Sequence, residues 1–193
     1  MTLDEYIAET AIITNVDTGN RYEGITMSEK ILLITYDNCD DSEVMYPYFR
    51  MLEAGYEVDV ASLEKRTINA KYHYKIEAGL LPDEIRPELY AGLILPGGTA
   101  PEKLRQNADI LNAVRYFMDN DLPVASICHG QQILISSGRI PGRRATCYPG
   151  IRDDLVNAGA LYENAPVVVD RKLVTSRRPE DLPYFMREFM KLL

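Results

Sequence analysis

The chain alternates between short apolar runs and longer segments in which apolar residues recur every three or four positions. Apolar runs are typical of buried strands, and the helical spacing predicts amphipathic helices between them. The predicted strands span 31–35, 57–62, 92–95, 123–127, 167–169 and 173–175, the last two joined by a tight Asp-Arg-Lys turn. The predicted helices begin at Asp41 or Ser42, at Asn107, directly after Cys128, at Arg152 and at Asp181.

Alternating strands and helices predict a parallel sheet covered on both faces. We therefore expect residues 30–193 to form a single-domain, doubly wound α/β sandwich of the flavodoxin-like kind, with a mostly parallel central sheet. Residues 1–29 form an N-terminal extension, in which 11–16 and 21–26 flank Asp-Thr-Gly-Asn in the manner of a hairpin arm. Ligands in doubly wound folds bind at the carboxyl ends of the strands, so candidate chemistry is sought there.

Composition excludes several classes of protein. A net charge of −8 argues against a nucleic-acid partner, and the pairs Arg143-Arg144 and Arg177-Arg178 are interpreted as solvated loop charges or anion contacts. No apolar run reaches the ~20 residues that span a bilayer, and the N-terminus lacks a secretory signal. Three cysteines without a Cys-x-x-Cys spacing predict neither disulfides nor a metal site, so we expect a cytoplasmic protein without a cofactor.

The run 123–127 ends abruptly at Cys128, and a helical pattern begins at once. Strand, sharp turn and helix form a nucleophile elbow, which holds a reactive side chain at its apex. A thiol at a helix N-terminus lies near the positive end of the helix dipole and near free backbone N–H groups, and both favour the thiolate. We therefore expect a catalytic Cys128 with a pKa well below the ~8.5 of a free cysteine.

Two further segments follow strands and can converge on Cys128. Glu43, at the start of a helix, is either a carboxylate favoured by the helix dipole or an acid hydrogen-bonded to the thiol. Gly97 and Gly98 form a tight turn, and their N–H groups with that of His129 are a candidate oxyanion hole. The His129 ring either packs away from the thiol or transfers protons.

These residues lie in a pattern that resembles the PfpI-type intracellular protease family, of the ThiJ/PfpI superfamily. Relatives include the parkinsonism-associated deglycase and the class I glutamine amidotransferases. The resemblance covers about residues 30–193 and rests on five ordered motifs. They are Ser-Glu-Val-Met-Tyr-Pro-Tyr at 42–48, Leu-Pro-Gly-Gly-Thr-Ala-Pro-Glu at 95–102, Ala-Ser-Ile-Cys-His-Gly at 125–130, Tyr-Pro-Gly-Ile-Arg-Asp-Asp at 148–154, and Val-Thr-Ser-Arg-Arg-Pro-Glu-Asp-Leu-Pro at 174–183.

The resemblance implies Cys128 as nucleophile, Glu43 as the acid beside it, and homodimers or hexamers in which Glu102 reaches His129 of a neighbouring subunit. It implies a cysteine hydrolase that attacks the carbonyl carbon of a small carbonyl compound or a peptide. Deglycase or glyoxalase-type handling of aldehyde damage is favoured over proteolysis. Gln131 stands where family members often have proline, which predicts an altered pocket mouth.

Three other functions are weighed against this one. The chief alternative is a stress sensor without turnover, in which Cys128 is oxidised and Cys39 acts either as a resolving thiol or as a bystander. An isonitrile hydratase relative would more often carry Asp at the position of Glu43. Amidotransferase activity would need a separate downstream histidine, and the second histidine, His73, lies upstream.

Overall fold

The computed structural model describes residues 29–193. A six-stranded sheet forms its centre, in the order β2-β1-β5-β6-β10-β9. The strands are β1 (Lys30–Ile34), β2 (Glu57–Ala61), β5 (Tyr90–Leu95), β6 (Val124–Ile127), β9 (Val167–Asp170) and β10 (Leu173–Ser176). All neighbours pair in parallel except β9 and β10, which pair antiparallel. The expected doubly wound, mostly parallel α/β sandwich is confirmed. The predicted hairpin arm lies outside the described residues.

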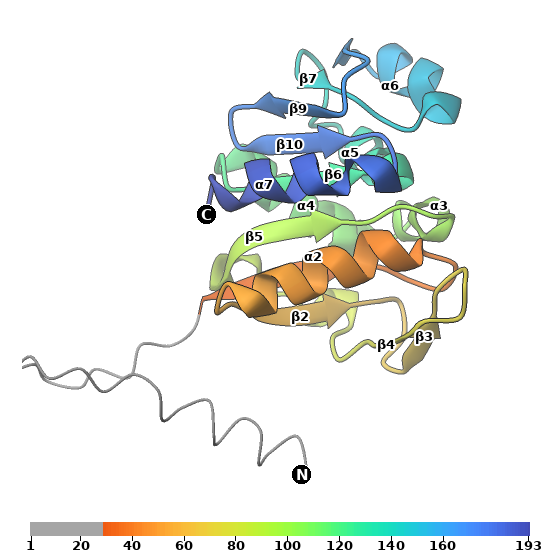
Figure 1. The fold of residues 1–193 in the computed structure, drawn as a ribbon, viewed down its shortest axis with the longest axis vertical. Coiled ribbons are helices and arrows are strands. Elements are labelled where there is room, and N and C mark those ends of the chain that lie inside the picture. The colour runs from red at the N-terminus through yellow and green to blue at the C-terminus, as the bar shows by residue number, and fades with distance from the viewer. Residues whose placement is uncertain (1–28) are drawn as a thin grey trace, which may run out of the picture.

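Helices cover both faces of the sheet (Figure 1). Helices α2 (Asp41–Glu53) and α7 (Leu182–Met190) lie on one face and pack against each other. Helices α4 (Ala108–Asp119) and α5 (Gln131–Ser137) lie on the other face, with α3 (Ala100–Leu104) beside α5. Helix α6 (Arg152–Asn157) lies near the β9 edge. Because both faces are covered, Ile31, Leu32, Leu33 and Ile34 of β1 are fully buried.

Most predicted helix boundaries are confirmed within one or two residues. Asn107 caps α4, since its side-chain oxygen accepts hydrogen bonds from the backbone N–H groups of Asp109 and Ile110. The predicted cap of the first helix is wrong, because Asp40 accepts from the backbone of Ser42 and Glu43. The Asp41 carboxylate is engaged elsewhere, by the backbone N–H groups of Tyr72 and Tyr74.

The sequence pattern missed several short elements. These are the hairpin of β3 (Thr67–Asn69) and β4 (Lys75–Glu77), the parallel pair of β7 (Arg144–Ala145) and β8 (Leu161–Tyr162), helix α3, and 3-10 turns at Pro82–Glu84, Pro87–Leu89, Pro149–Ile151 and Pro179–Asp181. Two- and three-residue strands are too short to show an alternating pattern. The β3–β4 hairpin matters for function because its turn carries Lys71, described below.

The strand order places the candidate residues together. After β2 the chain crosses over β1 and returns as β5, so β1 and β5 are neighbours whose following loops lead away from each other. Such a reversal opens a crevice at the carboxyl ends of the strands. Glu43 follows β1, Gly97 and Gly98 follow β5, and Cys128 follows β6. Three loops distant in sequence therefore meet at one edge.

Candidate active site

Cys128 occupies a strained elbow. It follows the last residue of β6 and opens a 3-10 turn (Cys128–Gly130) that leads into α5. Its φ is +61°, in the left-handed region that residues other than glycine rarely adopt and that costs ~1–3 kcal/mol. The Cys128 carbonyl accepts a hydrogen bond of 3.2 Å from the backbone N–H of Tyr148, which helps to hold this conformation. The side chain lies at the apex, and the residue is 8% exposed.

Glu43 is fully buried beside this thiol. Its Oε2 accepts a hydrogen bond of 2.8 Å from the backbone N–H of Gly97, and its Oε1 is buried without a hydrogen-bond partner among the described residues. Burial, reinforced by the charge of Asp40, raises the pKa of Glu43 to about 8, although Gly97 and Cys128 lower it. At neutral pH the carboxyl is therefore mostly protonated, and of the two readings of Glu43 the structure supports the acid beside the thiol.

Close packing explains both glycines of the turn after β5. A Cβ on Gly97 would lie 2.7 Å from Cys128 Cβ and 2.7 Å from Glu43 Oε2. Gly98 has a φ of +76°, and a Cβ there would lie 2.3 Å from the carbonyl oxygen of Asn38. Neither separation is possible for a real side chain, so the turn can approach the site only with glycine at both positions.

The predicted oxyanion hole needs one correction. The Gly97 N–H already donates to Glu43 and is not available to a ligand. The backbone N–H groups of Gly98 and His129 are directed toward the Cys128 sulfur, where they lower the pKa of the thiol. Two amides beside the attacking atom are the arrangement that an oxyanion requires. The candidate hole is therefore reduced to Gly98 and His129.

The ionisation of Cys128 differs from the sequence-based expectation. Burial raises the pKa of the Cys128 thiol, and negative charge on Glu43 raises it further, against the lowering effect of the two amides. The prediction of a strongly lowered pKa is therefore wrong for the resting site. Glu43 raises the pKa of Cys128 through its negative charge, and a protonated Glu43 carries no such charge. Protonation of Glu43 therefore removes the electrostatic part of the barrier to thiolate formation, and the effect of burial stays.

The His129 ring contacts the thiol. Its Nδ1 lies 3.3 Å from Cys128 Sγ, and the ring stacks on Tyr148 with centroids 4.8 Å apart. The reading in which the ring packs away from the thiol is thus excluded. Burial lowers the pKa of His129, and the charge of Glu102 raises it. A neutral imidazole in the Nε2–H tautomer leaves Nδ1 free to accept the thiol proton.

Glu102 lies on α3 and is exposed. Within the described residues it makes no hydrogen bond to His129, although its charge affects the His129 pKa. The chain by itself therefore shows a Cys-His contact supported by Glu43, and the Cys-His-Glu arrangement across an interface stays a prediction.

A pocket of about 400 Å³ opens over Cys128. Its lining comes from the loops after β1, β5, β6 and β10, from the turn between β3 and β4, and from Tyr148. Lys71, Tyr148 and Arg178 are lining residues that the sequence reasoning did not assign to the site. One indication for Arg178 was present in the sequence, because the Arg177-Arg178 pair was among the candidate anion contacts.

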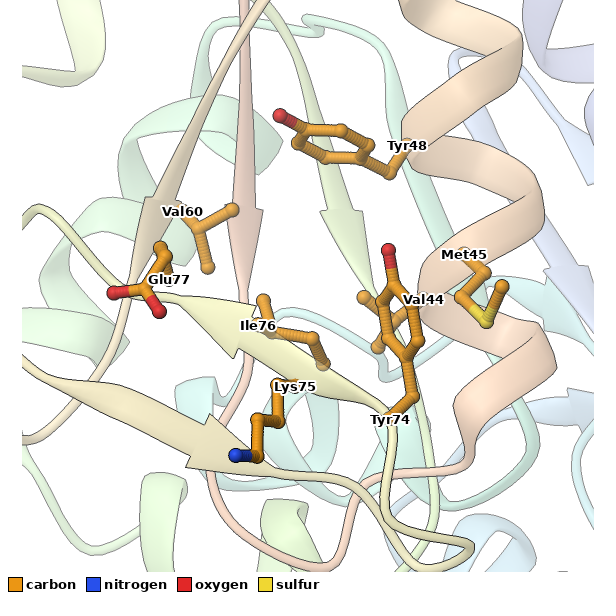
Figure 2. Close-up of a pocket in the computed structure, with 8 residues that line it drawn as sticks. All are labelled: Val44, Met45, Tyr48, Val60, Tyr74, Lys75, Ile76 and Glu77. Atoms are coloured by element: carbon orange, nitrogen blue, oxygen red, sulfur yellow. The ribbon is translucent and has the colours of Figure 1, made fainter.

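A second cavity of about 210 Å³ lies between α2, β2 and β4 (Figure 2). Its walls include Val44, Tyr48, Val60 and Ile76, with no cysteine or histidine among its lining residues. It therefore lacks a thiol and an imidazole, the two groups that meet at Cys128. Among residues 29–193 no cluster of three His, Cys, Asp or Glu residues is arranged to hold a metal ion, and no helix there is long and apolar enough to cross a bilayer.

Gln131 does not alter the pocket mouth, contrary to expectation. Its side chain is fully buried, and its Nε2 donates to the backbone carbonyls of Ser126, Thr146 and Ser176 at 3.0–3.1 Å. The residue joins the end of β6, the end of β10 and the loop after β7.

The other thiols, Cys39 and Cys147, are fully buried and free, and burial raises the pKa of Cys39 to about 11.

Comparison with known proteins agrees with this geometry. A sequence model of the DJ-1/PfpI family matches residues 29–192. The chain is 48% identical to a Pyrococcus horikoshii protein named as a deglycase, over 85% of this chain and 99% of that one. It is 38% identical to a Bacillus subtilis protein named as a candidate cysteine protease, over 86% of this chain and 99% of that one.

A solved structure from Anabaena variabilis, described as a two-domain protein with DJ-1/ThiJ/PfpI-like and ferritin-like domains, superposes with a TM-score of 0.83 at 31% identity. The match covers 85% of this chain and 48% of the two-domain protein, so this chain spans about half of that protein's length. The identification made from the five motifs is confirmed: the chain belongs to the DJ-1/PfpI family.

Proposed function

We propose that this protein is a cysteine-dependent hydrolase that attacks carbonyl carbons of small aldehyde-derived compounds through Cys128, in the manner of a deglycase. The observation that carries this proposal is the convergence of the strained Cys128 elbow, the buried Glu43 acid and the Gly98 and His129 amides on one pocket. Relatives named as deglycases, at 46–48% identity, support the same chemistry.

The reaction follows from the positions of the protons. His129 Nδ1 accepts the Cys128 proton as the sulfur attacks, and protonated Glu43 leaves no negative charge beside the developing thiolate. A carbon–sulfur bond forms, the carbonyl π bond breaks, and the oxygen becomes an anion stabilised by the Gly98 and His129 N–H groups. An aldehyde gives a thiohemiacetal, whose oxygen takes the proton back from His129. With methylglyoxal, an internal proton shift from this carbon and its hydroxyl to the neighbouring ketone converts the thiohemiacetal into a thioester, which water hydrolyses to lactate and the free thiol. An amide or thioester expels its leaving group, which takes the proton from His129, and water then hydrolyses the acyl-enzyme.

Pocket size favours small substrates over polypeptides. About 400 Å³ is at the lower end of volumes for small-molecule sites, and Cys128, which lines this pocket, is only 8% exposed. Peptidase activity is therefore the less favoured form of the same chemistry. Three free cysteines are consistent with a reducing compartment, so we place this activity in the cytoplasm.

A stress sensor is less well supported than an enzyme. Oxidation of a thiol depends on the thiolate already present, and burial raises the pKa of Cys128. Catalysis needs the thiolate only at the moment of attack, when His129 can take the proton. Cys39 is also buried, with a raised pKa, which favours the bystander over the resolving thiol.

Consumption of methylglyoxal and of its adducts with small thiols tests the proposal. We expect Cys128→Ala to lower kcat/KM by at least about 10³-fold, because nucleophile and base act as a unit. Cys147→Ala, which removes a buried thiol that does not line the pocket, should retain the activity. Equal rates for the wild-type protein and Cys128→Ala would refute the enzymatic proposal, and selective peroxide oxidation of Cys128 would then favour the sensor.

We further propose that the active form is a homodimer, or a hexamer built from dimers, with Glu102 contributed across an interface. Glu102 is exposed on α3 and makes no hydrogen bond to His129 within the described part of its own chain. An exposed carboxylate whose charge reaches the site histidine is available to contact a neighbouring copy.

A further inference from the structure

The pocket over Cys128 holds two cationic side chains that the proposed reaction does not use. Lys71 and Arg178 both line it, and Asp40 is the single carboxylate among its described lining residues. The chain as a whole has a net charge of −8, so two cations at the mouth of the nucleophile pocket do not follow from composition.

Lys71 is placed by a turn that is fixed to the start of α2. Its backbone N–H donates to the Cys39 carbonyl at 2.9 Å, and the N–H groups of Tyr72 and Tyr74 donate to the two oxygens of Asp41 at 2.7 and 2.9 Å. No carboxylate of a described residue forms an ion pair with the Lys71 ammonium, whose Nζ lies 5.0 Å from the centre of the Tyr72 ring. The Tyr72 hydroxyl, as a hydrogen-bond partner, is the main cause that raises the pKa of Lys71, and the charges of Asp40 and then of Cys128 raise it further, so the ammonium is within electrostatic reach of both groups.

Arg178 is placed by its neighbour. The Arg177 guanidinium is largely buried, donates from Nε and Nη2 to the Asp181 carboxylate at 2.9 and 3.1 Å, and contacts Asn164. This ion pair fixes the turn after β10 and leaves the Arg178 side chain, 52% exposed, at the pocket. Among residues 29–193, Glu180 is the one carboxylate that pairs with Arg178, at 3.7 Å, and an exposed pair of this length is weak enough for a ligand to displace.

The carboxylate that lines the pocket is hydrogen-bonded, so its charge is reduced, although it still acts on Glu43 and Lys71. Asp40 Oδ1 accepts hydrogen bonds from the backbone N–H groups of Ser42 and Glu43 and from the Ser42 hydroxyl. These donors and the positive end of the 13-residue helix α2 offset its charge. The two cations, in contrast, have donors to spare. A guanidinium and an ammonium together form the usual protein partners of a carboxylate or phosphate.

We propose that the substrates of this site are small carbonyl compounds that carry a carboxylate, which binds between Lys71 and Arg178 while the carbonyl carbon faces Cys128. This inference rests on the proposed function for turnover, but the anion preference of the pocket can be measured without turnover. The binding half of the proposal is therefore testable even if the catalytic half fails.

The test compares two reagents of nearly equal size that alkylate Cys128. Iodoacetate carries a carboxylate and iodoacetamide is neutral; with each, sulfur forms a bond to the methylene carbon and iodide leaves. The ratio of their rate constants cancels changes in thiol ionisation. We expect Lys71→Met and Arg178→Gln each to lower the iodoacetate-to-iodoacetamide ratio about fivefold at low salt, the effect of one surface charge at contact range. Mass spectrometry confirms that Cys128 is the alkylated residue.

Two further variants serve as controls, one that removes a negative charge from the pocket and one that removes a positive charge outside it. Asp40→Asn removes the lining carboxylate but retains a good helix cap, so it should raise the ratio. Lys75→Met removes a lysine from the neighbouring hairpin strand that does not line this pocket and should leave the ratio unchanged. Ratios that stay within twofold of the wild-type value in both Lys71→Met and Arg178→Gln would overturn the proposal.

The second test compares enzymatic turnover of substrates with and without a carboxylate. 2,3-Dioxopropanoate, an α-oxo aldehyde that carries a carboxylate in place of the methyl group, is compared with methylglyoxal, and the methylglyoxal adduct of N-acetylcysteine with that of N-acetylcysteine amide. We expect kcat/KM to favour the carboxylate member of at least one pair by about fivefold or more, and Arg178→Gln to abolish the preference. The pair that shows the preference identifies the source of the carboxylate, free oxo acid or thiol adduct. Equal kcat/KM within both pairs would overturn the substrate assignment, whereas no turnover with any compound would instead count against the proposed function.

Discussion

At the scale of single residues, Glu43 shows how the fold sets a protonation state. The carboxyl is excluded from water and has one backbone donor, so the neutral form is favoured and its pKa rises to about 8. A charged Glu43 would oppose the thiolate that catalysis needs, whereas a protonated Glu43 can donate a hydrogen bond to it. The residue therefore contributes to reactivity at a cost to stability.

That cost predicts the pH dependence of folding. A raised pKa means that the folded protein holds a proton that the unfolded chain releases above pH ~4.5, so Glu43 lowers the free energy of unfolding progressively as the pH rises to about 8. Glu43→Gln keeps an acceptor for Gly97 and removes this slope. We expect its Tm to equal the wild-type value near pH 5 and to exceed it at pH 8 by several degrees, since the site costs on the order of a few kcal/mol there.

Glu88→Gln is the matched control, because Glu88 is exposed and the substitution is chemically the same. Its Tm should follow the wild-type curve at every pH. If the difference in Tm between Glu43→Gln and the wild-type protein did not change between pH 5 and pH 8, the carboxyl would not be protonated in the folded protein.

At the scale of elements, the turn after β5 determines whether the site assembles. It passes so close to the loop that begins α2 that a Cβ on Gly98 would lie 2.3 Å from the Asn38 carbonyl and 2.6 Å from the Asp40 N atom. The Thr99 N–H also donates to the Asn38 carbonyl at 3.0 Å. These contacts couple the position of the Gly98 N–H to the cap of the helix that carries Glu43.

We therefore expect Gly98→Ala to destabilise the protein by about 2 kcal/mol or more, through both the clash and the positive φ, and to slow alkylation of Cys128 by iodoacetamide. Gly79→Ala is the control, because a Cβ there meets nothing within 4 Å. Similar losses of Tm in Gly98→Ala and Gly79→Ala would show that the close approach is not rigid.

At the scale of the whole molecule, the proposed active site depends on association of two copies of the chain, because Glu102 is proposed to act across their interface. If Glu102 acts across an interface, a Glu102→Gln subunit and a Cys128→Ala subunit can complement each other. We expect each variant alone to be impaired and a mixture, dissociated and reassociated, to be severalfold more active than the sum of the two. Activity equal to that sum would place the role of Glu102 within its own chain, where its charge already affects the His129 pKa.

Much of this molecule could be predicted because its signals are local. Continuous apolar runs mark strands covered on both faces, and Asn107 marks the start of α4. The abrupt change of pattern at Cys128 marks the elbow, and the order of motifs identified the family correctly. The meeting of Glu43 with Cys128 also followed, since both come directly after parallel strands.

The parts that could not be predicted depend on contacts between distant segments. Glu43 supplies an acceptor for Gly97, which removes that N–H from the oxyanion hole, and no local pattern shows this. The sign of the Cys128 pKa shift depends on how much water the fold excludes. Lys71 reaches the pocket on a hairpin of three-residue strands, too short to show periodicity in sequence.

Gln131 has a consequence for how the protein ages. One primary amide donates to three backbone carbonyls from three segments, and nothing else among the described side chains donates to the same three oxygens. Hydrolytic deamidation would replace the amide by a carboxyl group, which burial would favour in the protonated form as it does for Glu43, so no more than one of the three carbonyls would keep a donor. Chemical change at this one interior position would thus weaken the connection between the ends of β6 and β10, and β6 leads directly into Cys128.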